Sequence, residues 1–505
     1  MASTFAVTRN HLIFGVCLPF AVLLGYLLAD VRDPVSLVII MAAIAGLTFP
    51  ILMRWYHPIL IFSWNLTAQA TFLPGAPLMW ALCSWLGMFF AILNRSINAE
   101  NKFAHVPSLT APLLAFAVVI IATAAMTGGV NLQILGSSGV GGKQYFYILT
   151  AIMGFFALSS RKISPKHAYA FAALFYLPGI AGMFTHLAAK AGPAARLIFF
   201  LFPGEIATDL ADLAGQPQAD GVGEVRLGGM MAVSFALFSW MLVRYGIRGV
   251  FDLGRPWRLG IFLIGIAVGF LGGFRSHLIS VMLAFGILFV MERLWRTRVM
   301  LILIVMGFLS TVFLAAFANK LPSTIQRTIS FLPFDIDPMI KVQADSSSQW
   351  RIDIWKQVVE EVPVYFFKGK GYTYSSDDMY MAVYGQATLG AAGSAQGAVL
   401  AGDYHNGPLS LIIPFGIYGL LAFMWFVSAA LVYLYKAYKR GLPELKTINA
   451  FLFASFLSKT IFFFSIFGAI ATELYVYTGI LGLSVALNMH KSAELEGDVE
   501  PSPAP

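Results

Sequence analysis

Charged residues are scarce in this chain of 505 residues. Asp, Glu, Lys and Arg make up 11% of it, hydrophobic residues make up 58%, and the mean hydropathy is +0.77. Because a soluble protein carries roughly 25% charged residues, the composition excludes a soluble globular protein. The sequence also lacks the period-2 alternation of an outer-membrane barrel. Its repeated long apolar runs predict an all-α polytopic membrane protein.

Cysteine is nearly absent, and the two present, Cys17 and Cys83, both lie in apolar runs. The polar loops therefore contain no disulfide framework and no thiolate metal site. Acidic residues show no ligand spacing with histidine either. Asp335 and Asp337 lie among prolines and are expected to form a turn. We expect no metal and no cofactor.

About fourteen apolar segments follow one another, which predicts about 12–14 transmembrane helices. Segments 35–53 and 58–74 are expected to be separate, and segment 259–271 is short enough to need neighbours around it. The first segment, residues 11–29, could pass as a signal peptide, but it is long, has no convincing cleavage site and is followed by further spans. We therefore expect it to remain as a span.

Basic residues predict the orientation of these helices. With the N-terminus in the cytoplasm, the inner loops hold 19 Lys and Arg residues and the short outer loops hold six. Cytoplasmic loops of membrane proteins carry such an excess. The sequence thus predicts a cytoplasmic N-terminus, a cytoplasmic C-terminus and an outer loop of about 90 residues. The net charge of +8 is attributed to topology and membrane lipids, not to nucleic acid.

The chain is accordingly divided into four parts. Residues 1–318 hold helices 1–11, 319–408 form the large outer loop, 409–489 hold helices 12–14, and 490–505 form a disordered tail. Within the loop, Ser348 is expected to cap an amphipathic helix of about fourteen residues that ends near Pro363. Its apolar stripe comprises Ile354, Trp355, Val358, Val359 and Val362.

Two arginines on the predicted outer side are candidate phosphate ligands. Arg275 opens a span in "GGFRSHL", where a guanidinium and a helix N-terminus both favour an anion. Arg351 lies in the first turn of the loop helix. The alternatives are an arginine reaching lipid headgroups and a solvated surface charge. His277 is interpreted as a packed or interfacial histidine that supports this site.

His405 stands at the outer end of a span in "GDYHNGPLSL". With an ordinary pKa near 6.5, an imidazole can accept a proton at neutral pH. Asp403 or Asn406 could orient the ring, and Asn406 could instead cap the helix. A structural role for His405 is the alternative.

Lys459 is a cation within the predicted thirteenth span. An ionisable residue inside the membrane marks a functional site by default. Glu473 lies across a short outer turn and could pair with it, and such an ion pair would only fix helix packing.

Arg275, Arg351 and His405 together form the minimal set for glycosyl transfer from a lipid-diphosphate sugar: two diphosphate ligands and one base. The sequence around them resembles the bacterial O-antigen ligase and polysaccharide polymerase superfamily. Three patterns carry the resemblance in order: "GGFRSHL", "RIDIWKQVVEEVPVYFFKGKGY" and "HNGPLSLIIPFGIYGLLAF". Phe274 departs from the family pattern, which has a small residue before the first arginine.

The resemblance implies a glycosyltransferase C-like membrane fold and a metal-independent, inverting transfer of an undecaprenyl-diphosphate-linked glycan to an acceptor hydroxyl. Arg275 and Arg351 would bind the diphosphate, and His405 would activate the acceptor. The implied location is the periplasmic face of a bacterial inner membrane. The implied partners are the glycan donor, a lipid or glycan acceptor, a flippase and a chain-length regulator.

Other classes of protein remain as alternatives. A transporter or flippase of lipid-linked or anionic substrates would place charges near the midplane of several broken helices. Here the polar outliers gather at the outer ends of the spans, and Lys459 stands alone. A structural membrane subunit that docks partners through its long loop is the third class, and it would make no use of the arginine and histidine set.

Overall fold

The structure is a computed structural model that describes residues 22, 25, 34–73, 75–98, 103–127, 142–185, 198, 201–202, 227–372, 399, 402, 404–491 and 495. The chain divides into two compact units, Met1–Tyr56 and His57–Pro505, and everything below concerns the second unless stated otherwise. The predicted first span, the Gly/Ala-rich end of the outer loop and the predicted disordered tail fall largely outside the described residues.

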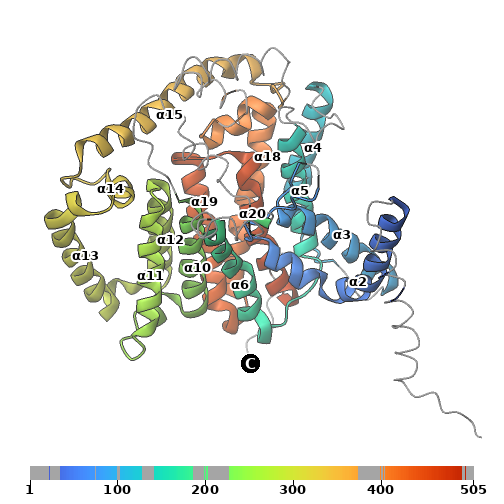
Figure 1. Cartoon of the computed structure of the whole chain (residues 1–505), viewed down its shortest axis with the longest axis horizontal. Helices are drawn as coiled ribbons and strands as arrows, with labels where there is room; N and C mark the ends of the chain where they lie inside the picture. Colours follow the sequence, from blue (N-terminus) through green and yellow to red (C-terminus); the bar gives the residue numbers. More distant parts are fainter. Residues whose placement is uncertain are drawn as a thin grey trace, which may run out of the picture. The chain divides into compact units, whose positions relative to one another are not determined.

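Helices form nearly all the regular structure of the described residues (Figure 1). They are α2 (Pro34–Ser63), α3 (Met79–Ile97), α4 (Pro107–Thr127), α5 (Gly142–Leu158), α6 (Ala168–Tyr176), α10 (Gly228–Val250), α11 (Trp257–Leu271), α12 (Arg275–Met291), α13 (Arg298–Phe317), α14 (Ser323–Ile329), α15 (Pro338–Tyr365), α18 (Gly407–Arg440), α19 (Lys446–Ser465) and α20 (Ile470–Asn488). Within this described part, eight helical stretches are long and apolar enough to cross a membrane. The predicted class, an all-α polytopic membrane protein, is confirmed.

Segments 35–53 and 58–74 were expected to be separate helices, and this is wrong. Helix α2 runs without interruption from Pro34 to Ser63. The polar side chains of Arg54 and His57 lower the local hydropathy, but they do not interrupt the helical backbone. Beyond Ser63 the chain forms turns and a single isolated bridge between Gln69 and Leu78.

The packed core contains α20 and α19, whose faces are buried among their neighbours. A buried pair of amides joins these two helices near one end. Asn449 Nδ2 donates to Asn488 Oδ1 over 3.0 Å, and Asn488 Nδ2 donates back over 2.9 Å. Interhelical hydrogen bonds of this kind stabilise helix pairs in lipid, where no water competes. The pair therefore fixes the register of α19 against α20.

Helix α18 breaks where Pro414 and Gly416 interrupt its backbone. Gly416 has φ 65° and ψ −169°, a conformation that is essentially restricted to glycine. At the break Ile417 N donates to Phe366 O, which lies outside α18, and carbonyls of α18 are available to donors outside the helix. The segment after α15 supplies such donors: Lys370 N donates to Ile413 O over 2.7 Å, and Gly371 N donates to Pro414 O over 3.0 Å. The segment that follows α15 is thus anchored to α18.

The loop helix is longer than the sequence predicts. Helix α15 begins at Pro338 and ends at Tyr365, so Ser348 lies inside it and is not its cap. The cap is Asp337, whose Oδ1 accepts from Met339 N over 2.8 Å, and Pro338 follows at the first helical position. An aspartate followed by proline is a favourable helix start. The expected turn at Asp337 is therefore the start of α15, which also continues through Pro363.

Candidate functional site

Helix α15 packs its apolar stripe on the first turns of α18 (Figure 1). Ile354 and Val358 are fully buried against Leu409 and Ile413 of α18. Val359 was predicted to belong to this stripe but is 55% exposed. It follows Val358 directly, so it points to a different side of the helix. The stripe holds the middle of α15, which contains Trp350 and Arg351, against the start of α18.

His405 lies just before α18 in a strained backbone conformation. Its φ is 51°, which is uncommon for a residue with a side chain. The preceding carbonyl, Tyr404 O, accepts from Trp355 Nε1 of α15 over 3.0 Å. Two aromatic rings pack against the imidazole in T-shaped contacts. The centroid of its ring lies 5.2 Å from that of Trp350 and 4.9 Å from that of Phe467. Such strain is typical of positions that a surrounding structure holds in place for a function.

Arg351 shares one of these aromatic neighbours with His405. Its guanidinium carbon is 5.7 Å from the centre of the Phe467 ring, a cation–π distance. Phe467 belongs to the short connection between α19 and α20. The ring therefore lies beside both an arginine of α15 and the histidine at the start of α18.

Arg275 is the first residue of α12, and its side chain contacts α15. Its Nη2 donates to Ala344 O over 2.7 Å and to Ser348 Oγ over 3.1 Å, both on α15. Ser348 precedes Arg351 by three residues, which is about 4.5 Å along a helix axis. Arg275, Arg351 and His405, far apart in the sequence, are thus gathered around one half of α15. All three side chains are partly exposed.

Asn406 is the N-cap of α18. Its Oδ1 accepts from Leu409 N over 3.0 Å, and its carbonyl accepts from Ser410 N. Of the two roles expected for Asn406, the structure shows the cap. Asp403, the other residue expected to orient the histidine ring, lies outside the described residues.

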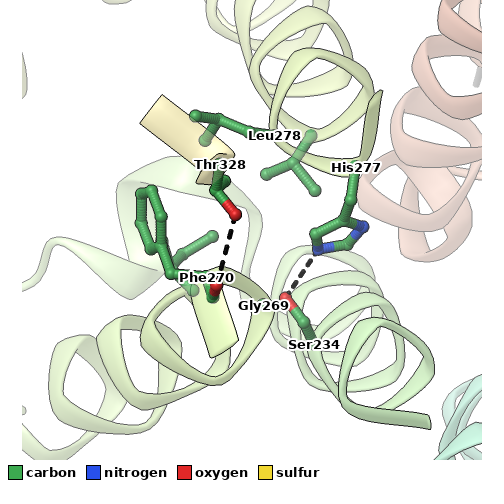
Figure 2. Close-up of a pocket in the computed structure, with 8 residues that line it drawn as sticks. Ser234, Gly269, Phe270, His277, Leu278 and Thr328 are labelled. Atoms are coloured by element: carbon green, nitrogen blue, oxygen red, sulfur yellow. Dashed lines mark hydrogen bonds between the residues drawn. The ribbon is translucent and has the colours of Figure 1, made fainter. Parts of the chain in front are cut away.

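The side chain of His277 points toward Ser234 of α10 and Gly269 of α11 (Figure 2). Its Nε2 lies 2.8 Å from Ser234 Oγ of α10, and its ring packs against Gly269 of α11. The cavity beside it measures about 10 Å³. This is close to the smallest volume that can hold one water molecule. Arg275 and His277 are two positions apart, so they lie on nearly opposite sides of α12. The structure therefore places His277 in helix packing, apart from the two arginines.

Lys459 pairs with Glu473, as its position in the sequence suggested. Its Nζ lies 2.7 Å from Glu473 Oε1, and the pair joins α19 to the first turn of α20. The ammonium also lies 5.7 Å from the centre of the Phe462 ring, which contacts Phe467 at 6.4 Å. Lys459 is therefore separated from His405 by two aromatic rings, and its direct partner is Glu473.

Sequence reasoning missed the aromatic residues of the site. Trp350 directly precedes Arg351, and Phe467 stands in an apolar turn. Nothing in the local pattern distinguishes Phe467 from its phenylalanine neighbours. Trp350 carried the stronger signal because it adjoins a candidate arginine.

Among the described residues, no group of three or more His, Cys, Asp or Glu side chains is placed to hold a metal ion. The candidate site instead offers two guanidinium groups, one imidazole and two aromatic rings. Guanidinium groups bind phosphate oxygens through paired hydrogen bonds. An imidazole can take a proton from a hydroxyl at neutral pH. The arrangement suits chemistry on a phosphorylated substrate near a membrane surface.

Comparison with known families bears on the same part of the chain. Residues 260–424 match the family model for O-antigen ligase. The match confirms the resemblance to the O-antigen ligase-like superfamily. This O-antigen ligase segment runs from α11 into α18, covers about a third of the chain, and contains Arg275, Arg351 and His405. A comparison with curated proteins finds no match for the chain.

The O-antigen ligase segment and the apolar helices together indicate a bacterial membrane protein with ligase- or polymerase-type glycosyltransferase activity. Lys459 and Glu473 lie beyond the segment, in the last two described membrane helices.

Proposed function

We propose that the protein transfers an undecaprenyl-diphosphate-linked glycan to an acceptor hydroxyl at the site around α15. The observation that carries this proposal is that α15 brings Arg275, Arg351 and His405 to one end of the bundle. A polyprenyl-diphosphate donor keeps its chain in the bilayer and its diphosphate at the surface. A partly exposed arginine at the start of α12 and a second on α15, which packs on the first turns of α18, match that position.

The proposed reaction is a single displacement. The acceptor oxygen forms a bond to the anomeric carbon as the bond from that carbon to the diphosphate oxygen breaks. The acceptor proton passes to the imidazole of His405, and the electron pair leaves with the diphosphate. Arg275 and Arg351 neutralise the negative charge that develops there. Because the acceptor attacks opposite to the leaving group, the anomeric configuration is inverted.

In this proposal α15 is the element that aligns the donor with the base. Arg275 is bonded to α15 through Ala344 O and Ser348 Oγ, so the position of one diphosphate ligand depends on that helix. The rings of Trp350 and Phe467 pack edge-to-face on the ring of His405 and hold it in place, and Phe467 also lies beside Arg351. We place the site on the periplasmic face of the inner membrane, with a flippase supplying the donor and a chain-length regulator as a further partner.

The arginines are tested by conservative replacement. Arg275→Lys and Arg351→Lys keep the charge but lose the planar fork that binds two phosphate oxygens. We expect each to lower kcat/KM for glycan transfer by about tenfold or more. The measurement uses purified full-length protein in proteoliposomes with an undecaprenyl-diphosphate oligosaccharide as donor and a hydroxylated acceptor glycan.

Arg255→Lys, an exposed arginine in the turn between α10 and α11, is the matched control and should transfer at the wild-type rate. Transfer should also persist in excess chelator, because the proposed step uses no metal. Wild-type kinetics for both Lys variants of the site would refute diphosphate binding by these arginines.

A further inference from the structure

A large cavity lies at the opposite end of α12 and α18 from Arg275 and His405. It measures about 830 Å³. Helix α12 starts at Arg275 and ends at Met291, which borders this cavity together with the following Glu292. Helix α18 starts beside His405, and its last turns supply Tyr435, Tyr438 and Lys439. The two sites are therefore separated by the length of these helices.

The cavity is rich in cationic side chains. Arg248, Arg293, Lys439 and Lys446 line it, and all four are exposed. They come from α10, from the connection after α12, and from α18 and α19. Within the described part of the chain, no carboxylate forms an ion pair with Arg293, Lys439 or Lys446. Four cations on separate elements thus converge on one cavity.

Glu292 is the carboxylate in this lining, and the backbone holds it. Its Oε1 accepts from Ile247 N over 2.9 Å and its Oε2 accepts from Arg248 N over 3.1 Å, at the break that Gly246 makes in α10. Burial raises the pKa of the Glu292 carboxyl above its usual range, although these bonds and Arg248 oppose that rise. Both oxygens of the Glu292 side chain are thus bonded to backbone N–H groups of α10.

Aromatic and apolar side chains border the cations. Trp295 and Tyr435 line the cavity and are each 48% exposed. Val290, on the last turn of α12, is 57% exposed. Trp and Tyr are enriched at the level of lipid headgroups. The lining of the cavity thus contains four cationic side chains, exposed aromatic rings and an exposed apolar residue on α12.

We propose that this cavity binds the phosphate headgroup of an anionic membrane phospholipid, with an acyl chain along the Val290 side of α12. Basic pockets between the ends of membrane helices bind such headgroups. A free phosphate ion would satisfy the cations but would leave the exposed apolar flank unused. Charge counting places this end of the bundle in the cytoplasm, where the anionic lipids of the inner leaflet would meet it. The proposal is independent of the glycosyl transfer proposed above.

The test is a thermal-unfolding titration of the purified full-length chain in an uncharged detergent. Dioleoylphosphatidylglycerol should raise Tm in a saturable manner, because a ligand that binds the folded state stabilises it. Dioleoylphosphatidylcholine and inorganic phosphate should not. The double variant Lys439→Gln/Lys446→Gln should weaken the apparent Kd for the anionic lipid about thirtyfold. Both lysines are exposed, so the variant should unfold at the wild-type Tm without lipid.

Lys162→Gln/Lys166→Gln is the matched control. These exposed lysines lie in the connection after α5, outside the cavity. The same connection is joined to α20 by the hydrogen bond from Ile163 N to Ala486 O. The control should keep the wild-type Kd. An equal loss in both double variants would assign the effect to overall charge and overturn the proposal. An equal rise in Tm with inorganic phosphate would overturn the lipid as the ligand.

Discussion

At the scale of single residues, the candidate site depends on how His405 is held. Its backbone lies at φ 51°, and the next residue, Asn406, caps α18. The sequence placed His405 and Asn406 at the start of a membrane helix. It left open whether Asn406 caps that helix or orients the ring of His405. A hydrogen bond over 3.0 Å to Leu409 N decides for the cap. Serine can form this cap as well, whereas alanine cannot.

Replacement of Asn406 separates capping from a direct part in the reaction. Asn406→Ala should lower the free energy of unfolding by about 1 kcal/mol, and Asn406→Ser should recover it. Because serine lacks an amide, the Ser variant should still transfer glycan at close to the wild-type rate. Thermal unfolding and the transfer assay, measured on the same preparations, check this. A stable but inactive Ser variant would point to an amide that the reaction needs.

The residues that sequence analysis could not find are those whose neighbours come from distant segments. Arg275, Arg351 and His405 stand out because charged and ionisable side chains are rare in this chain. Phe467 is one of 44 phenylalanines, so only the fold shows that its ring lies beside His405 and Arg351. His277 stood out for its polarity, yet its partner Ser234 comes from α10 and places it in packing.

At the scale of elements, the break in α18 connects the outer loop to the membrane bundle. Gly416 is held at φ 65°, and a Cβ there would lie 2.7 Å from Phe367 O. Hydropathy located α18 well, because lipid-buried helices need long apolar runs. It could not show the break, since proline and glycine also occur in unbroken membrane helices.

Gly416→Ala should therefore destabilise the protein and misplace the end of α15. A side chain in this backbone conformation costs about 1–3 kcal/mol. We expect a lower Tm together with slower glycan transfer. Gly307→Ala is the matched control, because a Cβ at that position of α13 meets open space and a helix favours alanine over glycine. Equal Tm values for the two variants would show that the break is not strained.

The length of α15 shows where local signals compete. Ser348 and Asp337 are both residues that cap helices, and the sequence reading chose Ser348 because the apolar stripe begins after it. The structure chose Asp337, which Pro338 follows. The first three turns of α15 are polar and carry little periodicity. Ala344 and Ser348 within them bind Arg275, which no local pattern reveals.

At the scale of the whole molecule, the candidate site and the cationic cavity lie at opposite ends of α12 and α18. This arrangement agrees with the orientation that basic residues predict, in which Arg275, Arg351 and His405 lie outside and the cations near α10, α18 and α19 lie inside. The α-helical class followed from the composition together with the repeated long apolar runs. The number of spans did not, because α2 joins two apolar segments that hydropathy separates.

The orientation is checked by cysteine accessibility. In a Cys17→Ser/Cys83→Ala background, Lys356→Cys on α15 should react with a membrane-impermeant maleimide in spheroplasts. Arg255→Cys, in the exposed turn between α10 and α11, should react only after the membrane is opened. Both positions are exposed, so accessibility reports the side of the membrane. Reversed labelling would place the candidate site in the cytoplasm.

The most direct measurement of the central claim is glycan transfer by His405→Ala. The full-length variant is reconstituted in proteoliposomes with an undecaprenyl-diphosphate oligosaccharide and acceptor, beside His105→Ala, an exposed histidine before α4. The account predicts that His405→Ala lowers kcat about a hundredfold or more, as loss of a general base does, while Tm stays near the wild-type value and His105→Ala transfers normally. Transfer by His405→Ala at the wild-type rate would contradict it.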